Sequence, residues 1–138
     1  MLLGATRFTA FAILCALPFV PQTALAQDVD CANAATQLAM TYCAEQDWNA
    51  ADVKLNAAYK LAMAVLKGID SNLDAADQGA AIALRNAQRA WVPFRDATCD
   101  AEGWAYHGGS AEPMVIYACR ARVTAARAEE LNNMAAVD

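Results

Sequence analysis

The sequence has few of the features that mark β-structure. It contains only six glycines and four prolines in 138 residues, which leaves little material for frequent tight turns. No stretch alternates Val, Ile, Thr and aromatic residues between turn residues, as half-buried strands do. Alanine, the strongest helix former, is abundant instead. The sequence therefore predicts an all-α protein, and the lack of repeats, low-complexity tracts and linkers predicts a single domain.

Signatures of metal binding and catalysis are also missing. His107 is the only histidine, and no two cysteines have the C-x-x-C spacing of many zinc sites. Ser110 lies three residues after His107, but no third residue is indicated that would complete a catalytic triad. The neighbouring pair Gly108 and Gly109 lacks the lysine of a phosphate-binding loop. These absences argue against an enzyme and predict neither a cofactor nor a bound metal.

Residues 1–26 have the pattern of a cleaved signal peptide. Arg7 gives the positive start, residues 8–20 form the apolar segment, and the Ala-Leu-Ala sequence at 24–26 is a typical cleavage site. The apolar segment is too short for a transmembrane anchor, and prolines end it. We therefore expect a mature domain that begins at Gln27 and is periplasmic or secreted.

The expected mature chain is acidic. Loss of Arg7 reduces the ten Lys and Arg to nine against fifteen Asp and Glu, so the net charge changes from −5 to −6. Such a surface repels nucleic acids and anionic lipids and suits a basic protein partner, or serves solubility alone. Cys15 follows Ile13 and Leu14 rather than a small residue, so no lipid attachment and no membrane anchor are expected after cleavage.

Apolar residues at three- and four-residue spacing predict four helices. They cover roughly residues 36–44, 49–68, 77–100 and 110–134. Thr36 and Ser110 are the expected N-caps, and Gly68 is the expected C′ residue of the second helix. Pro93 falls inside the third helix and should bend it, whereas Pro113 falls in the first turn of the fourth, where proline is tolerated. The last two helices would form an antiparallel αα-hairpin.

Four cysteines remain after residue 26, and an even number in an oxidising compartment implies two disulfides with three alternative pairings. The hairpin would bring Cys99, at the end of one helix, opposite Cys119, about two turns into the next, which favours this pair. Cys31 and Cys43 would lie about 18 Å apart along one helix, beyond the reach of a disulfide. They can pair only if Cys31 precedes the helix and the chain folds back, and an N-cap at Thr36 permits this.

Several sequence blocks together resemble a known family. The chain reads TQ-x-x-M-x-x-CA from Thr36, D-x-x-LN-x-x-Y from Asp52 and QRAW-x-x-FRD-x-x-C from Gln88 to Cys99. A closing segment contributes Gly108, Gly109, Ser110, Cys119, Thr124, Arg127 and Leu131. In this order the blocks resemble the lysozyme inhibitor LprI-like N-terminal domain family, formerly a domain of unknown function, over nearly all of residues 27–138. The resemblance implies a small, helical, exported domain, and the family name implies binding and inhibition of lysozyme.

One face of the expected third helix carries polar residues beside an aromatic. Gln88, Trp91 and Arg95 recur at three- and four-residue spacing and therefore share this face. We expect Trp91 to fill the core and the polar groups to pair with neighbouring helices; the alternative is a polar binding site. The expected members of this supporting network are Asp52, Gln88, Trp91, Arg95, Asp96 and Arg127.

The loop before the last helix is the best candidate for partner binding. Its candidate residues are Trp104, Tyr106, His107, Gly108, Gly109 and Ser110. Trp and Tyr are preferred interface anchors, and a disulfide at the base of the loop limits the entropy lost on binding. Lysozyme-type glycosidases work with two carboxyl groups in a cleft, which the histidine, the hydroxyl or the glycine amides of this loop can hydrogen-bond. The alternative is a simple connector whose aromatics pack on the hairpin.

These observations predict an exported binding protein, similar to lysozyme inhibitors, that occludes a glycosidase. Its expected partner is a protein, with a basic lysozyme as the first candidate; the sequence leaves the oligomeric state open. The alternative is a non-enzymatic structural or interaction protein of the cell envelope, and a third reading is an enzyme of a new kind. Salt separates the first two, because an inhibitor steered by charge loses association rate steeply as salt rises.

Overall fold

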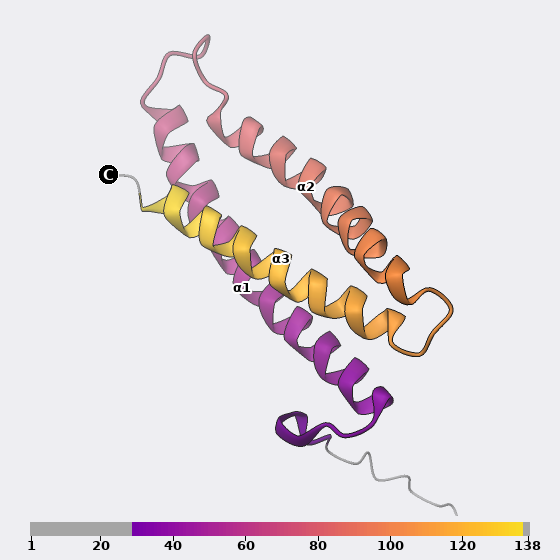
Figure 1. Cartoon of the computed structure of the whole chain (residues 1–138). Helices are drawn as coiled ribbons and strands as arrows, with labels where there is room; N and C mark the ends of the chain where they lie inside the picture. Colours follow the sequence, from indigo (N-terminus) through magenta and orange to yellow (C-terminus); the bar gives the residue numbers. More distant parts are fainter. Residues whose placement is uncertain (1–28, 137–138) are drawn as a thin grey trace, which may run out of the picture.

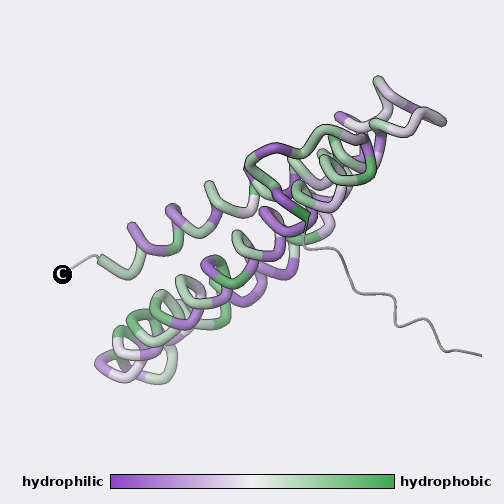
Figure 2. The backbone as a smooth tube through the Cα atoms, turned by 90° about the horizontal axis from the view of Figure 1, so that it is seen from below, coloured by the Kyte–Doolittle hydropathy of each residue, from purple (hydrophilic) through white to green (hydrophobic). Residues whose placement is uncertain are grey.

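The computed structural model describes residues 29–136, so the expected signal peptide and its cleavage site lie outside the described residues. All regular structure in this range is helical, which confirms the predicted fold class (Figure 1). The elements are η1 (Cys31–Asn33), α1 (Gln37–Ser71), α2 (Ala80–Gly103), η2 (Trp104–Tyr106) and α3 (Glu112–Ala135). Hydrophilic and hydrophobic residues are interspersed along the long helices (Figure 2). No helix of residues 29–136 is long and apolar enough to cross a membrane.

The prediction of four helices was wrong, because the first two are one continuous helix. α1 has 35 residues and passes without a break through residues 45–48, which separate the first two predicted helices. This stretch contains neither glycine nor proline, so nothing in it interrupts a helix. Gly68 is not a C′ residue, since α1 continues to Ser71.

The helix starts match the expected capping only in part. Thr36 caps α1 as predicted, because its hydroxyl oxygen accepts a hydrogen bond from the Ala39 N–H at 3.2 Å. Ser110 does not cap α3: the N-cap position is Ala111, which makes no side-chain cap bond. Glu112 and Pro113 occupy the first turn instead, an acidic residue favoured by the helix dipole and a proline that needs no hydrogen bond there.

α2 begins three residues later than expected, and a side chain from another helix caps it. The Asp70 carboxylate, near the end of α1, accepts hydrogen bonds from the backbone N–H groups of Gly79 and Ala80 at 2.9 Å and Ala81 at 3.0 Å. These bonds hold the pKa of Asp70 below its ordinary value, the Ala81 N–H making the largest contribution. Asp70 therefore closes the α1–α2 turn and fixes where α2 leaves it.

We expect Asp70→Asn to lower the melting temperature at neutral pH, because an amide cannot replace a carboxylate that accepts three N–H bonds. A carboxylate with a depressed folded-state pKa stabilises the fold above its unfolded pKa of about 3.9, and the stabilisation is lost as pH falls through the lower, folded value. The difference in melting temperature between wild type and variant should thus shrink below about pH 4. A difference that stays constant from pH 7 to pH 2.5 would contradict this role.

α3 packs mainly along α1, and α2 runs antiparallel to α3 and makes its larger set of contacts with it (Figure 1). The core is a thin layer of small and branched side chains: Leu55, Ala58, Ala62, Leu84, Ala128 and Leu131. Three of these six residues are alanines, and their small side chains permit the helix axes to approach closely. Larger side chains, including Tyr59 and Trp91, cover the edges of this layer.

The four cysteines of residues 29–136 form two disulfides, Cys31–Cys43 and Cys99–Cys119, with Cα–Cα distances of 5.5 and 5.4 Å. Cys31 lies in η1, before α1, so the chain folds back over the start of the helix as the spacing argument requires. Cys99 and Cys119 are fully buried between α2 and α3. The second disulfide thus fixes the hairpin immediately below the loop that joins these helices.

Candidate functional site

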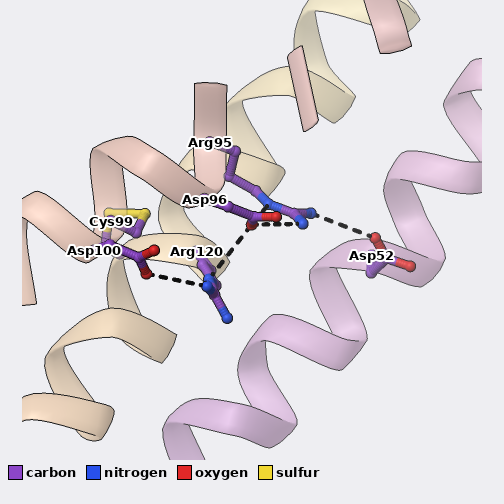
Figure 3. Close-up of polar contacts among 7 residues, drawn as sticks. Asp52, Arg95, Asp96, Cys99, Asp100 and Arg120 are labelled. Atoms are coloured by element: carbon purple, nitrogen blue, oxygen red, sulfur yellow. Dashed lines mark hydrogen bonds and ion pairs between the residues drawn. A yellow bond between two sulfur atoms is a disulfide. The ribbon is translucent and has the colours of Figure 1, made fainter. Parts of the chain in front are cut away.

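A central ionic cluster joins all three helices around Arg95. The Arg95 side chain on α2 is buried, with only 7% of the residue exposed. Its Nε donates a hydrogen bond to an Asp96 oxygen at 2.9 Å, and its Nη2 forms an ion pair with the same oxygen at 2.9 Å. Its Nη1 lies 4.0 Å from an oxygen of Asp52 on α1 (Figure 3). Arg120 on α3 reaches Asp96 at 3.5 Å and Asp100 at 3.2 Å. Two guanidinium groups therefore alternate with three carboxylates across the bundle.

Aromatic rings complete this cluster. The Arg95 guanidinium lies 5.3 Å from the ring centres of both Trp48 and Trp91, and that of Arg120 lies 5.1 Å from Trp48. Trp48 also stacks on Tyr117 of α3 at 5.7 Å. Cation–π contacts of this kind strengthen when the cation is removed from water, so the rings stabilise the charge that the fold buries.

The predicted network is only partly one unit. Asp52, Trp91, Arg95 and Asp96 meet in the central ionic cluster, as described above. Gln88 and Arg127 form a separate pair, with the Arg127 Nε donating to the Gln88 side-chain oxygen at 3.2 Å, and Arg127 also pairs with Glu130 at 2.8 Å. The sequence reasoning missed Trp48 and Arg120. Trp48 shares the face of Asp52 and Leu55 by helical spacing, but it lies just before the second predicted helix, which starts at residue 49.

Arg95→Ala is expected to lower the free energy of unfolding by about 1.5 kcal/mol, below the range for fully buried pairs because Asp52 and Asp96 remain partly hydrated. The melting temperature should fall by roughly 6 °C, as measured by thermal denaturation followed by circular dichroism. Arg122→Ala is the matched control, since Arg122 is largely exposed and Glu102 is its one ion-pair partner within residues 29–136. Equal effects of the two substitutions on the melting temperature would show that the central ionic cluster does not specifically stabilise the fold.

The loop between α2 and α3 exposes its aromatics. Trp104 is 66% and Tyr106 51% exposed, so these rings do not pack on the hairpin. The Trp104 ring stacks on the His107 ring at a centre-to-centre distance of 4.0 Å. The two rings thus form a stacked pair that is accessible at the end of the bundle. The candidate residues Tyr106 and Ser110 lie close to this pair in the sequence.

Glu112 holds this loop in shape. Its two carboxylate oxygens bind His107 Nδ1 at 3.0 Å and the Gly108 N–H at 2.8 Å. The His107 hydrogen bond, followed by that of Gly108, lowers the pKa of Glu112. Gly108 has φ +75°, a conformation in which other L-residues are strained, and the Gly109 N–H bonds the Tyr106 carbonyl at 2.9 Å. The loop is therefore a closed turn and not a flexible tether.

The base of the loop is equally constrained. Gly103, the last residue of α2, is buried, and a Cβ there would collide with the side chain of Ile116. α2 and α3 thus approach closely where only glycine fits, and the Cys99–Cys119 disulfide and the Glu102–Arg122 ion pair at 2.7 Å lie beside this contact. The loop is therefore anchored on a rigid end of the α2–α3 hairpin.

A second feature, not foreseen from the sequence, is an open groove of about 450 Å³ between α1 and α2. α1 contributes Asp52, Leu55, Asn56 and Tyr59, and α2 contributes Arg85, Gln88, Arg89, Val92 and Arg95. In residues 29–136 no group of His, Cys, Asp or Glu side chains is placed to hold a metal ion. The groove is thus lined by arginines, amides and apolar side chains with a single carboxylate, and it lacks the ligand set of a metal centre.

Residues 30–131 match the family described as lysozyme inhibitor LprI. An uncharacterized protein of Rhizobium meliloti (strain 1021) is 41% identical over 117 residues, which cover 83% of this chain and 84% of that relative. The fold is similar to the crystal structure of a DUF1311 family protein from Pseudomonas putida KT2440, with a TM-score of 0.65 and 23% identity over 77% of this chain and 100% of that one. At this identity the structural likeness concerns the fold alone. The family match, which spans most of the described residues, identifies the chain: it belongs to the lysozyme inhibitor LprI family.

Proposed function

We propose that this protein is an exported lysozyme inhibitor that occludes the substrate cleft of the enzyme with the loop between α2 and α3. The observation that carries the proposal is the stacked Trp104–His107 pair, exposed and held in place by Glu112. Tryptophan is enriched among the residues that dominate binding energy. A loop ordered before binding loses less entropy when it docks, so a rigid aromatic tip favours tight binding.

The chemistry of the tip suits a glycosidase cleft. Lysozyme-type enzymes place two carboxyl groups on either side of the scissile bond. An inhibitor that fills this cleft must offer groups that form hydrogen bonds with these carboxyl groups. The amide N–H of Gly109 already bonds within the loop, which leaves the His107 Nε2 and the exposed Ser110 hydroxyl as the groups facing a partner. Trp104 supplies a flat ring of the kind that packs against sugar-binding surfaces.

Overall charge supports a basic target. The whole chain carries −5, and −6 without residues 1–26, whereas lysozymes of the animal type are usually basic. Attraction between opposite net charges raises the association rate and is screened by salt, whose Debye length is about 10 Å at 0.1 M. The proposal therefore predicts that inhibition weakens as salt rises, which membership of the family alone does not predict.

The test is lysis of a peptidoglycan substrate by hen-type lysozyme, with and without the oxidised protein, at 20 and 200 mM salt. We expect dose-dependent inhibition at both, with the association rate falling about tenfold or more at the higher salt. A reduced and alkylated sample serves as the control for the hairpin.

Inhibition that is absent even with the protein in large excess would discard this target. The protein would then be a non-enzymatic interaction domain of the cell envelope, whose partner a pull-down must identify. Inhibition that does not change with salt would keep the occlusion but remove the role of charge.

A further inference from the structure

The groove between α1 and α2 differs in charge from the rest of the protein. Its lining includes Arg85, Arg89 and Arg95 against the single carboxylate of Asp52, a formal balance of +2 in a chain of net charge −5. A basic groove in an acidic protein concentrates anions locally while the remaining surface repels them. The composition of this groove therefore points to an anionic ligand.

The groove is built by two helix faces with the same spacing. On α2, Arg85, Arg89 and Val92 follow at intervals of four and three residues, and on α1 Asp52, Leu55 and Tyr59 follow at three and four. Residues at such spacing share a helix face. Arg85 and Arg89 thus lie on the same side of this groove.

Several donors in this groove have no partner within residues 29–136. Arg85 and Arg89 make neither a hydrogen bond nor an ion pair there, unlike Arg95, which Asp96 and Asp52 neutralise. Gln88 uses its side-chain oxygen to accept from Arg127, which leaves its NH₂ group for a ligand. Asn56 spends its NH₂ on Asp52 at 2.8 Å. The groups left without a partner, the two guanidinium groups and the Gln88 NH₂, are all hydrogen-bond donors. Guanidinium groups bind carboxylates and phosphates in bidentate geometry.

We infer that the α1–α2 groove binds a small amphiphilic anion, with its carboxylate or phosphate held by Arg85 and Arg89. The apolar part of the ligand lies against Val92 and Leu55, and the Gln88 NH₂ group donates to the anion. This site is independent of the proposed lysozyme inhibition, because Arg95 at its near end lies about 13 Å along the helix from Trp104, at 1.5 Å per residue.

The experiment is a titration of the ¹⁵N-labelled protein, followed by NMR, with hexanoate, hexyl phosphate, inorganic phosphate and hexanol as separate probes. We expect saturable shifts confined to residues 52–59 and 85–95 with hexanoate or hexyl phosphate, and none with hexanol. Saturation by hexanoate alone identifies a carboxylate ligand, and tighter binding of hexyl phosphate identifies a phosphate ester. Inorganic phosphate should bind at least tenfold more weakly than hexyl phosphate, because it leaves the apolar floor uncovered.

The variant pair is R85Q/R89Q with R122Q as the control. Both Arg85 and Arg89 are exposed, so the double variant is expected to fold with wild-type circular dichroism. It should weaken binding at least tenfold, whereas R122Q, which removes a charge beside Glu102 and outside the groove, should stay within twofold. Shifts spread over the whole surface, no saturation with either amphiphile, or equal losses in the two variants would each overturn the inference. If the double variant fails to fold, the wild-type shift map alone decides.

Discussion

Replacing Cys99 and Cys119 together by alanine is expected to lower the free energy of unfolding by about 3 kcal/mol, the value for closing a loop of some twenty residues. Their separation in sequence is 20, and both residues are fully buried. The melting temperature should therefore fall by roughly 12 °C or more for a domain of this size. Thermal denaturation of the oxidised wild type and the double variant measures the difference.

The Cys31–Cys43 disulfide supplies the matched control. Its separation of 12 residues is comparable, but η1 contains no buried residue. Without this bond the segment before α1 frays locally while the bundle stays folded, so the loss is limited to about 1 kcal/mol. A loss as large as that of the buried pair would show that η1 supports the bundle and would contradict this account.

What could be predicted from the sequence is mostly what neighbouring residues decide. The all-α class follows from alanine content and the scarcity of glycine and proline, and Thr36 as an N-cap depends on a bond three residues away. The cysteine pairing followed from the reach of a disulfide and the helix pattern around it. Each of these inferences needs only local geometry, and each agrees with the structure.

What could not be predicted depends on contacts between distant segments. The sequence does not show whether residues 45–48 separate two helices or continue one, whereas in the structure Trp48 packs against Tyr117 and Arg95 from a continuous α1. Asp70 caps a helix from nine to eleven residues upstream, a relation that no capping pattern contains.

Of the two candidate sites, the loop is formed by residues that are neighbours in the sequence, and the groove by residues that are distant in it. The loop candidates lie within seven consecutive residues, so their proximity was evident, and the structure adds the clamp by Glu112. The groove could not be predicted, because Arg89 and Asp52 line one groove only when α2 folds back beside α1. The separate Gln88–Arg127 pair could not be predicted, because helical spacing shows which face of a helix a residue occupies but not how far it lies from charges on other helices.

Trp104→Ala is expected to weaken lysozyme inhibition by about 30-fold, the effect of losing a binding anchor worth roughly 2 kcal/mol. The ring is 66% exposed, so its removal leaves the core intact and the melting temperature should change by no more than 2–3 °C, as for surface substitutions of about 0.5 kcal/mol. The inhibition constant from the lysis assay, together with thermal denaturation of the same sample, separates lost binding from lost folding.

Phe94→Ala is the control for an exposed aromatic. Phe94 is 62% exposed on α2, nine residues before the end of the helix, so its removal deletes a similar apolar area from a different surface. If the loop occludes the cleft, inhibition by this variant stays within twofold of wild type. If Phe94→Ala is as damaging as Trp104→Ala, binding is a general hydrophobic adhesion, and if Phe94→Ala alone is damaging, the face of α2 binds lysozyme. His107→Ala refines the result: because His107 both stacks on Trp104 and bonds Glu112, its loss should release the tip and raise the dissociation rate more than it lowers the association rate.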